Sequence, residues 1–316
     1  MPPIVTLTIN PAVDVSTSVR KMLPFTKMRC AEAQRDPGGG GINVARVLTR
    51  LGVDAIAIYP AGGATGQTLA ALVEHESVRS IVIPAANSTR EDITVFDETT
   101  REQFRLVFPG ALLNEFEWQQ CLDAVTRVSS QAGFVIASGS LPPGVPADFY
   151  GRVVKASRGV AKVIVDTTGD ALKAALEAGV YLIKPNLREF QDLAGISTED
   201  EPSLLEAGRS LLDRYRIEII ALSLGSQGAL LLARDIALRA NGLPIEPVSV
   251  SGAGDSFLGA MVSSFAHSND LEAALRYGVA GGSAALLRPG TGLCLREDIH
   301  RLASSVKVTA IAGHHA

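Results

Sequence analysis

Cysteine and long apolar runs are scarce in this sequence. The three cysteines, Cys30, Cys121 and Cys294, lie far apart in the 316 residues and form neither a CxxC pair nor a metal-site spacing. We expect them to be small buried hydrophobic side chains in a reducing compartment. The chain lacks the roughly 18 consecutive apolar residues of a membrane-spanning helix. The best candidate, residues 219–233, is interrupted by two glycines.

A large charge of either sign is also absent. The 29 lysines and arginines against 33 aspartates and glutamates give a net charge of −4 and a pI near 5.8. This balance provides no general attraction to nucleic acid or to an anionic membrane, so we expect neither partner. Any bound phosphate must therefore be held by local groups. The N-terminus shows no basic stretch followed by an apolar run, and we expect a cytoplasmic protein.

Short apolar runs alternate with amphipathic segments along most of the chain. Apolar runs without polar alternation, separated by helices, are typical of a parallel sheet that is covered on both faces. The pattern therefore predicts an α/β fold. The expected strands are residues 4–9, 55–60, 134–138, 162–166, 181–185 and 217–224. The expected helices are residues 42–51, 65–75, 114–128, 147–157, 170–177 and 202–214.

Two segments, residues 13–35 and 90–108, alternate polar and apolar residues instead. This alternation is typical of antiparallel strands with one solvated face, and Thr99-Thr100 is the expected hairpin turn. We expect the two segments to form a small sheet beside a core built from residues 1–12, 36–89 and 109–316. The last dozen residues are expected to form a loose tail.

The segment Ser251-Gly252-Ala253-Gly254-Asp255 precedes a helical run over residues 257–266. Small residues allow several backbone N–H groups to converge at a helix N-terminus, where they and the helix dipole bind anions. An aspartate beside the anion can accept a proton, which is the pairing that phosphoryl transfer needs. An ordinary helix start capped by Asp255 explains the same residues. Alone, the motif leaves both interpretations open.

Four consecutive glycines follow Pro37 and lead into Ile42 and Asn43. Each glycine costs about 1 kcal/mol against alanine in regular structure, so the run needs a reason. Close approach of a ligand to the backbone is one reason, and a flexible hinge is another. The run is not GxGxxG, and no GxxxxGK[ST] loop occurs in the chain, which argues against those two nucleotide sites. Asn43 is either a ligand contact or a helix cap.

Two further motifs follow expected strands. Lys184-Pro185-Asn186 is followed by Glu189, and an amide with a carboxylate suits Mg²⁺ that keeps most of its waters. Taken alone, the pair is explained more simply as a helix capping box. The segment from Ser223 to Gly228 reads SLGSQG, and a hairpin turn explains it fully.

Together, these motifs resemble the PfkB branch of the ribokinase-like carbohydrate kinases over nearly the whole chain. The glycine run continues to Gly52 and Gly62 as in that family's N-terminal signature, and residues 249–261 are similar to its C-terminal signature. The resemblance implies a ribokinase-like three-layer sandwich with a mostly parallel central sheet and a small β-sheet lid. It also implies a kinase that uses ATP and Mg²⁺, with K⁺ as a further candidate ion.

The resemblance also implies roles for particular residues. Asp255 resembles the catalytic base, and the amides of Gly252, Ala253 and Gly254 resemble the anion hole. The residues implied to bind the substrate are Asp14, Lys27, Gly39, Asn43, Arg90 and Ser138, with Lys27 and Arg90 on the lid and Arg90 supplied by the same chain or a partner. Those implied to contact the nucleotide are Lys184, Asn186, Ser223, Gly225 and Gly228. Those implied to bind Mg²⁺ through water are Asn186 and Glu189, and those near a K⁺ site are Ser249, Ser251, Ala285, Arg288 and Gly290.

The substrate is implied by two short stretches. PGGGGINVAR over 37–46 and PAGGATG over 60–66 are similar to the minor-type bacterial 6-phosphofructokinases. Relatives that act on fructose 1-phosphate or tagatose 6-phosphate commonly carry lysine where Gly40 stands. The resemblance therefore implies phosphorylation of fructose 6-phosphate by MgATP, a glycolytic reaction. A 1-phosphofructokinase or a tagatose-6-phosphate kinase is the alternative, and a non-catalytic sugar-phosphate-binding regulator is a third.

Two expectations remain. A small sheet exposes an apolar face unless a second lid covers it, so we expect a homodimer through the lid. Many family members carry Asp-Thr where this chain has Ser249-Val250. That difference affects the implied K⁺ site more than the base.

Overall fold

The computed structural model describes residues 2–311, and its largest element is a ten-stranded sheet. The strands of this sheet are β1 (Ile4–Leu7), β4 (Ala55–Ala61), β5 (Arg79–Pro84), β8 (Phe134–Ser138), β9 (Lys162–Asp166), β10 (Leu182–Ile183), β11 (Ile219–Ser223), β12 (Gly228–Ala233), β13 (Ile236–Asn241) and β14 (Val308–Ala310). Their order is β14-β13-β12-β11-β10-β9-β8-β1-β4-β5. All neighbours from β5 to β11 pair in parallel, and β12 to β14 add antiparallel strands at one edge.

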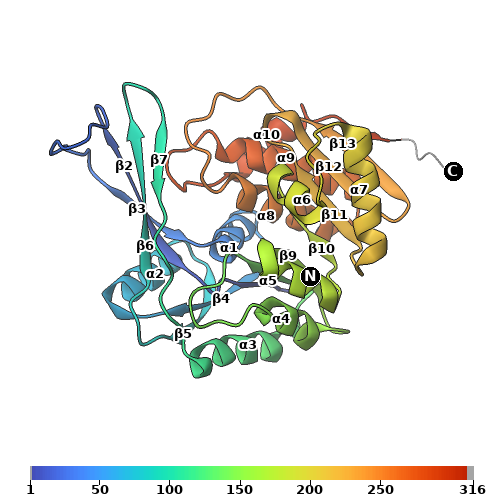
Figure 1. Ribbon diagram of the computed structural model, residues 1–316, viewed down its shortest axis with the longest axis horizontal. Coiled ribbons are helices and arrows are strands. Elements are labelled where there is room, and N and C mark those ends of the chain that lie inside the picture. The colour runs from blue at the N-terminus through green and yellow to red at the C-terminus, as the bar shows by residue number, and fades with distance from the viewer. Residues whose placement is uncertain (1, 312–316) are drawn as a thin grey trace.

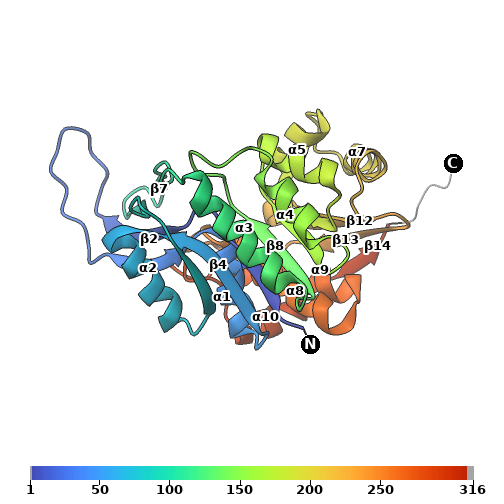
Figure 2. The same ribbon diagram turned by 90° about the horizontal axis from the view of Figure 1, so that it is seen from below.

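Helices cover both faces of this sheet (Figures 1 and 2). Successive strand residues point to opposite faces, so Phe134 and Ile136 of β8 enter one hydrophobic core while Val135 and Ala137 enter the other. The first core includes residues of α1 (Gly40–Arg50), α2 (Gly63–His75), α8 (Ala253–Ser268), α9 (Leu271–Ala285) and α10 (Arg296–Ala303). The second includes residues of α3 (Glu115–Ser129), α4 (Phe149–Ser157), α5 (Gly169–Ala178), α6 (Leu187–Ala194) and α7 (Glu201–Arg214). The predicted three-layer α/β architecture is confirmed.

A second, four-stranded sheet stands beside the main body (Figure 1). Its strands, in the order β3-β2-β6-β7, are β2 (Ala12–Val19), β3 (Gln34–Gly38), β6 (Arg90–Asp97) and β7 (Gln103–Leu106). The outer pairs are antiparallel as predicted, and a turn at residues 98–100 forms the expected hairpin. The central pair, β2 and β6, is parallel, which the sequence analysis got wrong. Both strands arrive from the carboxyl ends of main-sheet strands, β1 and β5, so they enter in the same direction.

Some expectations fail locally. Cys121 and Cys294 are buried as predicted, but Cys30 is exposed in the loop between β2 and β3. Residues 308–310 of the predicted tail form β14, which pairs with β13, while residues 312–316 lie outside the described residues. In the described part of the chain, no helix has the length and apolar character needed to cross a membrane.

Candidate active site

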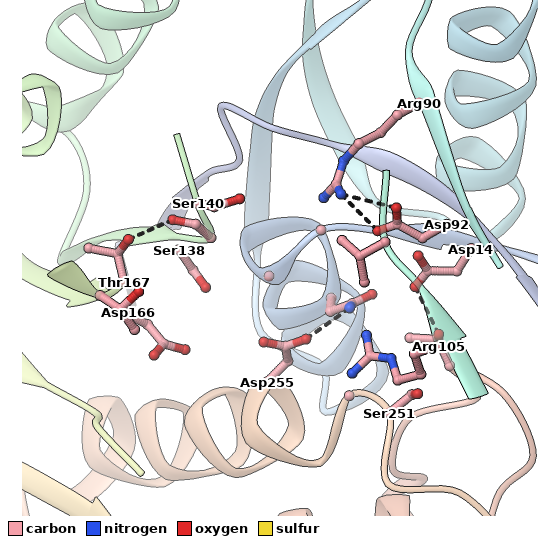
Figure 3. A pocket seen from close by; sticks show the side chains of 18 of the residues that line it. Asp14, Arg90, Asp92, Arg105, Ser138, Ser140, Asp166, Thr167, Ser251 and Asp255 are labelled. Carbon is pink, nitrogen blue, oxygen red and sulfur yellow. Dashed lines mark hydrogen bonds and ion pairs between the residues drawn. The ribbon is translucent and has the colours of Figure 1, made fainter. Parts of the chain in front are cut away.

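A cavity of about 330 Å³ lies at the carboxyl ends of β1, β8 and β9. The strand order changes direction at β1, because β4 pairs on one side of it and the later strand β8 on the other. Open α/β sheets bind their ligands at such a switch point. The second sheet contributes four side chains to the cavity wall, Asp14, Arg90, Asp92 and Arg105 (Figure 3). The cavity therefore lies between the two sheets.

Asp255 lies in the first turn of α8 and lines this cavity. The helix begins after Gly252, whose φ of 74° lies in the left-handed region that favours glycine. No side chain caps this helix start, so the N–H groups of the first turn and the helix dipole give it partial positive charge. The Ala253 N–H makes a long bond, 3.4 Å, to the Val250 carbonyl. The anion-hole role of Gly252, Ala253 and Gly254 stays a prediction.

Asn43 holds the Asp255 carboxylate. Its Nδ2 donates to Asp255 Oδ2 at 2.9 Å, and its Oδ1 accepts from Arg46 Nη1 at 3.1 Å. The N-cap of α1 is Gly39, so the capping interpretation of Asn43 is wrong. Asn43 and Gly39 both line the cavity, and their contact with the sugar stays a prediction.

The environment of Asp255 raises its pKa from the ordinary value of 3.8 to about 6. Burial is the main cause, and the Asp166 carboxylate adds to it, whereas Asn43 and Lys184 act in the opposite direction. Asp14 contributes a smaller increase. A general base works best with a pKa near the operating pH, so this aspartate suits proton abstraction at neutral pH.

The Lys184 ammonium lies near the first turn of α8 and adds a positive charge there. Its Nζ lies 3.3 Å from Asp166 Oδ1, and a Cβ added to Gly254 would meet the ammonium at 3.3 Å. Burial alone would lower the pKa of Lys184, but the nearby Asp166, Asp255 and Glu189 raise it, so the ammonium stays charged. Asp166 was not predicted as a site residue, although its position as the last residue of a buried parallel strand was an available signal.

Asn186 and Glu189 form the capping box of α6. Asn186 Oδ1 accepts from the Glu189 N–H, and Glu189 Oε2 accepts from the Asn186 N–H, both at 2.9 Å. The simpler interpretation of this pair is therefore confirmed. Glu189 also lines the cavity, so its second carboxylate oxygen can face a ligand. Among the described residues, no group of three or more His, Cys, Asp or Glu could hold a metal directly. The site fits Mg²⁺ bound through water and substrate phosphates.

The glycine run packs closely against side chains of the cavity. A Cβ at Gly38 would lie 2.4 Å from Asp14 Oδ1, and one at Gly40 would lie 2.1 Å from Ser138 Oγ. Asp14 is fixed further by Thr291, whose Oγ1 donates to Asp14 Oδ2 at 2.8 Å. The run ends β3 and opens α1, so it acts through close approach and not as a flexible hinge.

The arginine side chains of the second sheet differ in the hydrogen bonds and ion pairs that they make. Arg90, on this same chain, pairs with Asp92 at 2.9 Å and donates to the Phe108 carbonyl at 2.9 Å. The Arg105 side chain lines the cavity and makes no hydrogen bond or ion pair with another described residue, while its backbone pairs with Thr94 in the sheet. The sequence analysis did not select Arg105, although it shares the polar face of β7 with Gln103. Lys27 lies in the exposed loop after β2, and the structure does not bring it to the cavity wall.

The segment from Ser223 to Gly228, at the end of β11, lies beside Lys184-Pro185-Asn186, which follows β10. Ser223 N–H donates to the Pro185 carbonyl at 3.0 Å, and Ser223 bridges to Asn186. Gly225 and Gly228 have positive φ values of 58° and 97° in the predicted turn between β11 and β12. Asn186 also lines a neighbouring cavity of about 530 Å³, which shares two residues with the first, Thr168 and Glu189.

The residues of the implied K⁺ site are partly brought together. Ser249 Oγ donates to the Gly290 carbonyl at 2.9 Å. The Ser251 hydroxyl is buried and has no hydrogen-bond partner among the described residues. The Ala285 carbonyl accepts from the Arg288 N–H at 3.1 Å. A buried hydroxyl oxygen without a hydrogen-bond partner fits a monovalent cation as its ligand.

The fold and the cavity place an aspartate, a helix N-terminus and cationic side chains at a switch point, as a phosphotransferase of the ribokinase-like fold requires. The chain matches the pfkB family carbohydrate kinase profile over residues 4–298, and it belongs to that family. Carbohydrate kinase is thus the class of the enzyme.

Three relatives are informative. ATP-dependent 6-phosphofructokinase isozyme 2 of Mycobacterium tuberculosis is 45% identical over 301 residues, which cover 95% of this chain and 88% of that protein. The isozyme 2 of Escherichia coli is 40% identical over 302 residues, covering 95% and 97%. The 1-phosphofructokinase of Borreliella burgdorferi is 29% identical over 309 residues, covering 98% and 99%.

Solved structures of the E. coli protein, phosphofructokinase-2, superpose closely. The complex with fructose-6-phosphate has a TM-score of 0.91 at 38% identity and covers 96% of this chain and 99% of that one. The complex with potassium has a TM-score of 0.92, and the tetrameric inhibited form has 0.90.

Proposed function

We propose that this chain transfers the terminal phosphoryl group of ATP to the 1-hydroxyl of fructose 6-phosphate and so forms fructose 1,6-bisphosphate in glycolysis. The observation that carries the proposal is Asp255, held by Asn43 at the N-terminus of α8 in a cavity that Arg105 also lines. The identities of 45% and 40% to two 6-phosphofructokinases support the substrate.

In this mechanism Asp255 takes the proton of the 1-hydroxyl while the hydroxyl oxygen bonds to phosphorus. The bond from phosphorus to the bridging oxygen breaks, and ADP leaves with that electron pair. The first-turn amides of α8 and the Lys184 ammonium offset negative charge on the transferring group. Because this transition state is loose, positioning and electrostatics contribute more than the strength of the base.

The sugar phosphate is held by the second sheet. Arg105 offers its whole guanidinium to a phosphate, for which the planar fork is well suited. Arg90 adds charge, although its Nη1 is committed to Asp92 and Phe108. Asp14 faces the sugar hydroxyls as an acceptor. Asp14, Gly39, Asn43, Arg90 and Ser138 thus keep their implied contacts with the substrate, whereas Lys27 does not reach this cavity from its own chain.

The neighbouring cavity of about 530 Å³ would receive ATP, because Asn186 lines it and bridges to Ser223, where the turn from Ser223 to Gly228 begins. Lys184 would contact the ATP phosphates. Glu189 would hold Mg²⁺ through water, and the ion would supply charge neutralisation on the phosphates. K⁺ would be held by oxygens around Ser251 and Gly290, and the E. coli relative has been solved in complex with potassium.

The second sheet acts as a lid, residues 13–35 and 90–108, over a core of residues 1–12, 36–89 and 109–316. Apolar side chains exposed on and after β7 support a dimer through this lid. They are Phe104, Leu106, Val107 and Phe108. A compact monomer in sedimentation at micromolar concentration would contradict the dimer, and a tetramer would match the form known for the E. coli relative. The cytoplasmic location stays a prediction.

The alternatives differ in substrate or in catalysis. A lysine at position 40, common in the fructose-1-phosphate and tagatose-6-phosphate types, would have to displace the Ser138 hydroxyl, because a Cβ there would lie 2.1 Å from Ser138 Oγ. The presence of Asp255 disfavours a non-catalytic regulator. The test is kcat/KM with MgATP for fructose 6-phosphate, fructose 1-phosphate and tagatose 6-phosphate. We expect at least about a tenfold preference for fructose 6-phosphate. The position of the phosphate on the sugar determines whether it can form charged hydrogen bonds with the arginines of the second sheet. A preference for another sugar would contradict the substrate, and no turnover with any would contradict the kinase.

A further inference from the structure

Arg46 on α1 is a fully buried cation that lines neither of the two cavities described above. Its side chain is 1% exposed, and its guanidinium makes five hydrogen bonds. Nε and Nη2 donate to Glu76 Oε1 at 3.1 and 2.6 Å. Nη1 donates to three acceptors, each at 3.1 Å, which are Asn43 Oδ1, the Pro37 carbonyl and the Thr291 carbonyl. A buried charge is tolerated only with such complete pairing, so the residue needs a reason beyond filling space.

The three acceptors of Nη1 belong to three parts of the cavity wall. Asn43 holds Asp255 through its Nδ2. Thr291 holds Asp14 through its hydroxyl. Pro37 precedes the glycine run that packs against Asp14 and other side chains. One guanidinium nitrogen therefore joins the segments on which the proton acceptor and a sugar-facing carboxylate depend.

The contact with Asn43 also sets which end of its amide faces Asp255. A side-chain amide has one accepting and one donating end, and a guanidinium offers only donors. Because Arg46 occupies Oδ1, Nδ2 must point toward the carboxylate, as observed at 2.9 Å. An amide rotated the other way would place its oxygen against the carboxylate and repel it.

We propose that Arg46 is a positioning residue for phosphoryl transfer, which acts through the Asn43 amide to hold Asp255 in line with the sugar hydroxyl. The inference rests on the proposed kinase function. It assigns a catalytic effect to a side chain that touches neither substrate nor the reacting atoms.

Arg50, one turn further along α1, provides a matched control. It shares Glu76 with Arg46, at 2.8 and 3.0 Å, and donates to the Gly292 and Cys294 carbonyls. It makes no hydrogen bond to Asn43. A purely structural role of the buried ion pairs would be lost in Arg50→Met as in Arg46→Met, whereas the orientation of Asn43 depends on Arg46 alone.

The charged groups that surround Asp255 differ from those that surround Arg46. Asp255 is faced by Asp166, Lys184 and Asp14, and none of these hydrogen-bonds Arg46. Arg46 is faced by Glu76, by Arg50 across the shared Glu76, and by the Asp36 carboxylate at 3.9 Å. A change at Arg46 therefore reaches Asp255 through Asn43 and not by replacing a neighbouring charge.

The test compares Arg46→Met and Arg50→Met in the full-length enzyme with MgATP and fructose 6-phosphate. Misplacing a catalytic group by about 1 Å costs up to about 100-fold in rate, so we expect kcat of Arg46→Met to fall about 10–100-fold. We expect KM for ATP to change less than about threefold, and the acidic limb of the kcat profile to move to higher pH as Asp255 loses a fixed donor. Arg46→Lys, which keeps the positive charge and three N–H donors on a single nitrogen, should recover part of kcat. Arg50→Met should keep kcat within about threefold of the parent.

A double mutant tests whether Arg46 acts through Asn43. In an Asn43→Ala background, Arg46→Met should lower kcat by less than about threefold, because residues that act as one unit are not additive. Equal kcat losses in Arg46→Met and Arg50→Met, or full additivity with Asn43→Ala, would overturn the proposal. Circular dichroism and Tm establish that each variant folds, and Arg46→Lys replaces Arg46→Met throughout if the latter does not. An inactive parent enzyme would contradict the proposed function instead, before any variant is compared.

Discussion

Replacing Asp255 by asparagine should weaken catalysis and strengthen the fold at the same time. Asparagine has nearly the same shape and can still accept the hydrogen bond from Asn43 Nδ2, now 2.9 Å from Oδ2 of the aspartate. It cannot take a proton from the sugar hydroxyl. Loss of a general base lowers kcat by about 10² or more, and substrate binding should change little.

The stability gain follows from the pKa of the aspartate. Burial and Asp166 raise that pKa from 3.8 to about 6, so the fold favours the neutral carboxyl. Each pH unit corresponds to about 1.4 kcal/mol, which sets an upper limit of about 3 kcal/mol on the cost of keeping the charge. Because the side chain lines a cavity and is only half-buried, we expect Asp255→Asn to raise the free energy of unfolding by about 1–2 kcal/mol at neutral pH.

The sign of this effect depends on pH. A carboxyl with a raised folded-state pKa stabilises the protein below its unfolded-state pKa, and that contribution is lost as pH rises through about 6. The Tm of Asp255→Asn should therefore exceed that of the parent by about 2–5 °C near pH 8, and the two should converge near pH 4. Differential scanning calorimetry without ligands measures both, and an ADP-release assay measures kcat.

A matched control removes a carboxylate that is exposed. Asp235 lies in the turn between β12 and β13, and Asp235→Asn should leave Tm and kcat unchanged. Near-parental turnover in Asp255→Asn would refute the base assignment. An unchanged or lower Tm near pH 8 would refute the reasoning from burial.

Three further outcomes are expected. The kcat/KM of the parent should fall about tenfold per pH unit below about 6, as Asp255 becomes protonated; a flat rate profile would contradict this. Arg105→Met should raise KM for the sugar phosphate about 10–100-fold, the loss expected for a charged hydrogen bond, while Arg127→Met on exposed α3 should not; equal KM values would contradict the phosphate contact. Gly40→Ala should lower kcat/KM at least about tenfold, because its Cβ would meet a serine hydroxyl at 2.1 Å. Gly133→Ala, whose Cβ would meet nothing nearer than 3.7 Å, should not.

The main sheet could be predicted from the sequence because its strands are unbroken apolar runs. IVTL and FVIAS, for example, are buried along their whole length in β1 and β8. The missed strand β5 is mostly exposed or half-buried, so its sequence RSIVIP carries a weaker signal. The parallel pairing of β2 with β6 depends on where the chain leaves the main sheet, which local alternation does not encode.

The site was predictable where a motif carried the chemistry. Asp255, Asn43 and the glycine run were found from their sequence motifs and line one cavity. Asp166 and Arg105 were missed, because each is a single charged residue at the end or on the face of a strand. Only the fold shows which strand ends meet. The buried network of Arg46 was equally hidden, since an arginine in a helix is ordinarily an exposed side chain.

Direct phosphoryl transfer to fructose 6-phosphate is the reaction on which the mechanism depends, and phosphorus NMR of one reaction mixture can follow it. With enzyme, MgATP and fructose 6-phosphate, we expect the ATP signals to give way to ADP while a second sugar phosphomonoester appears in equal amount. Formation of ADP with inorganic phosphate and no second sugar phosphate, or no change in the spectrum, would contradict it.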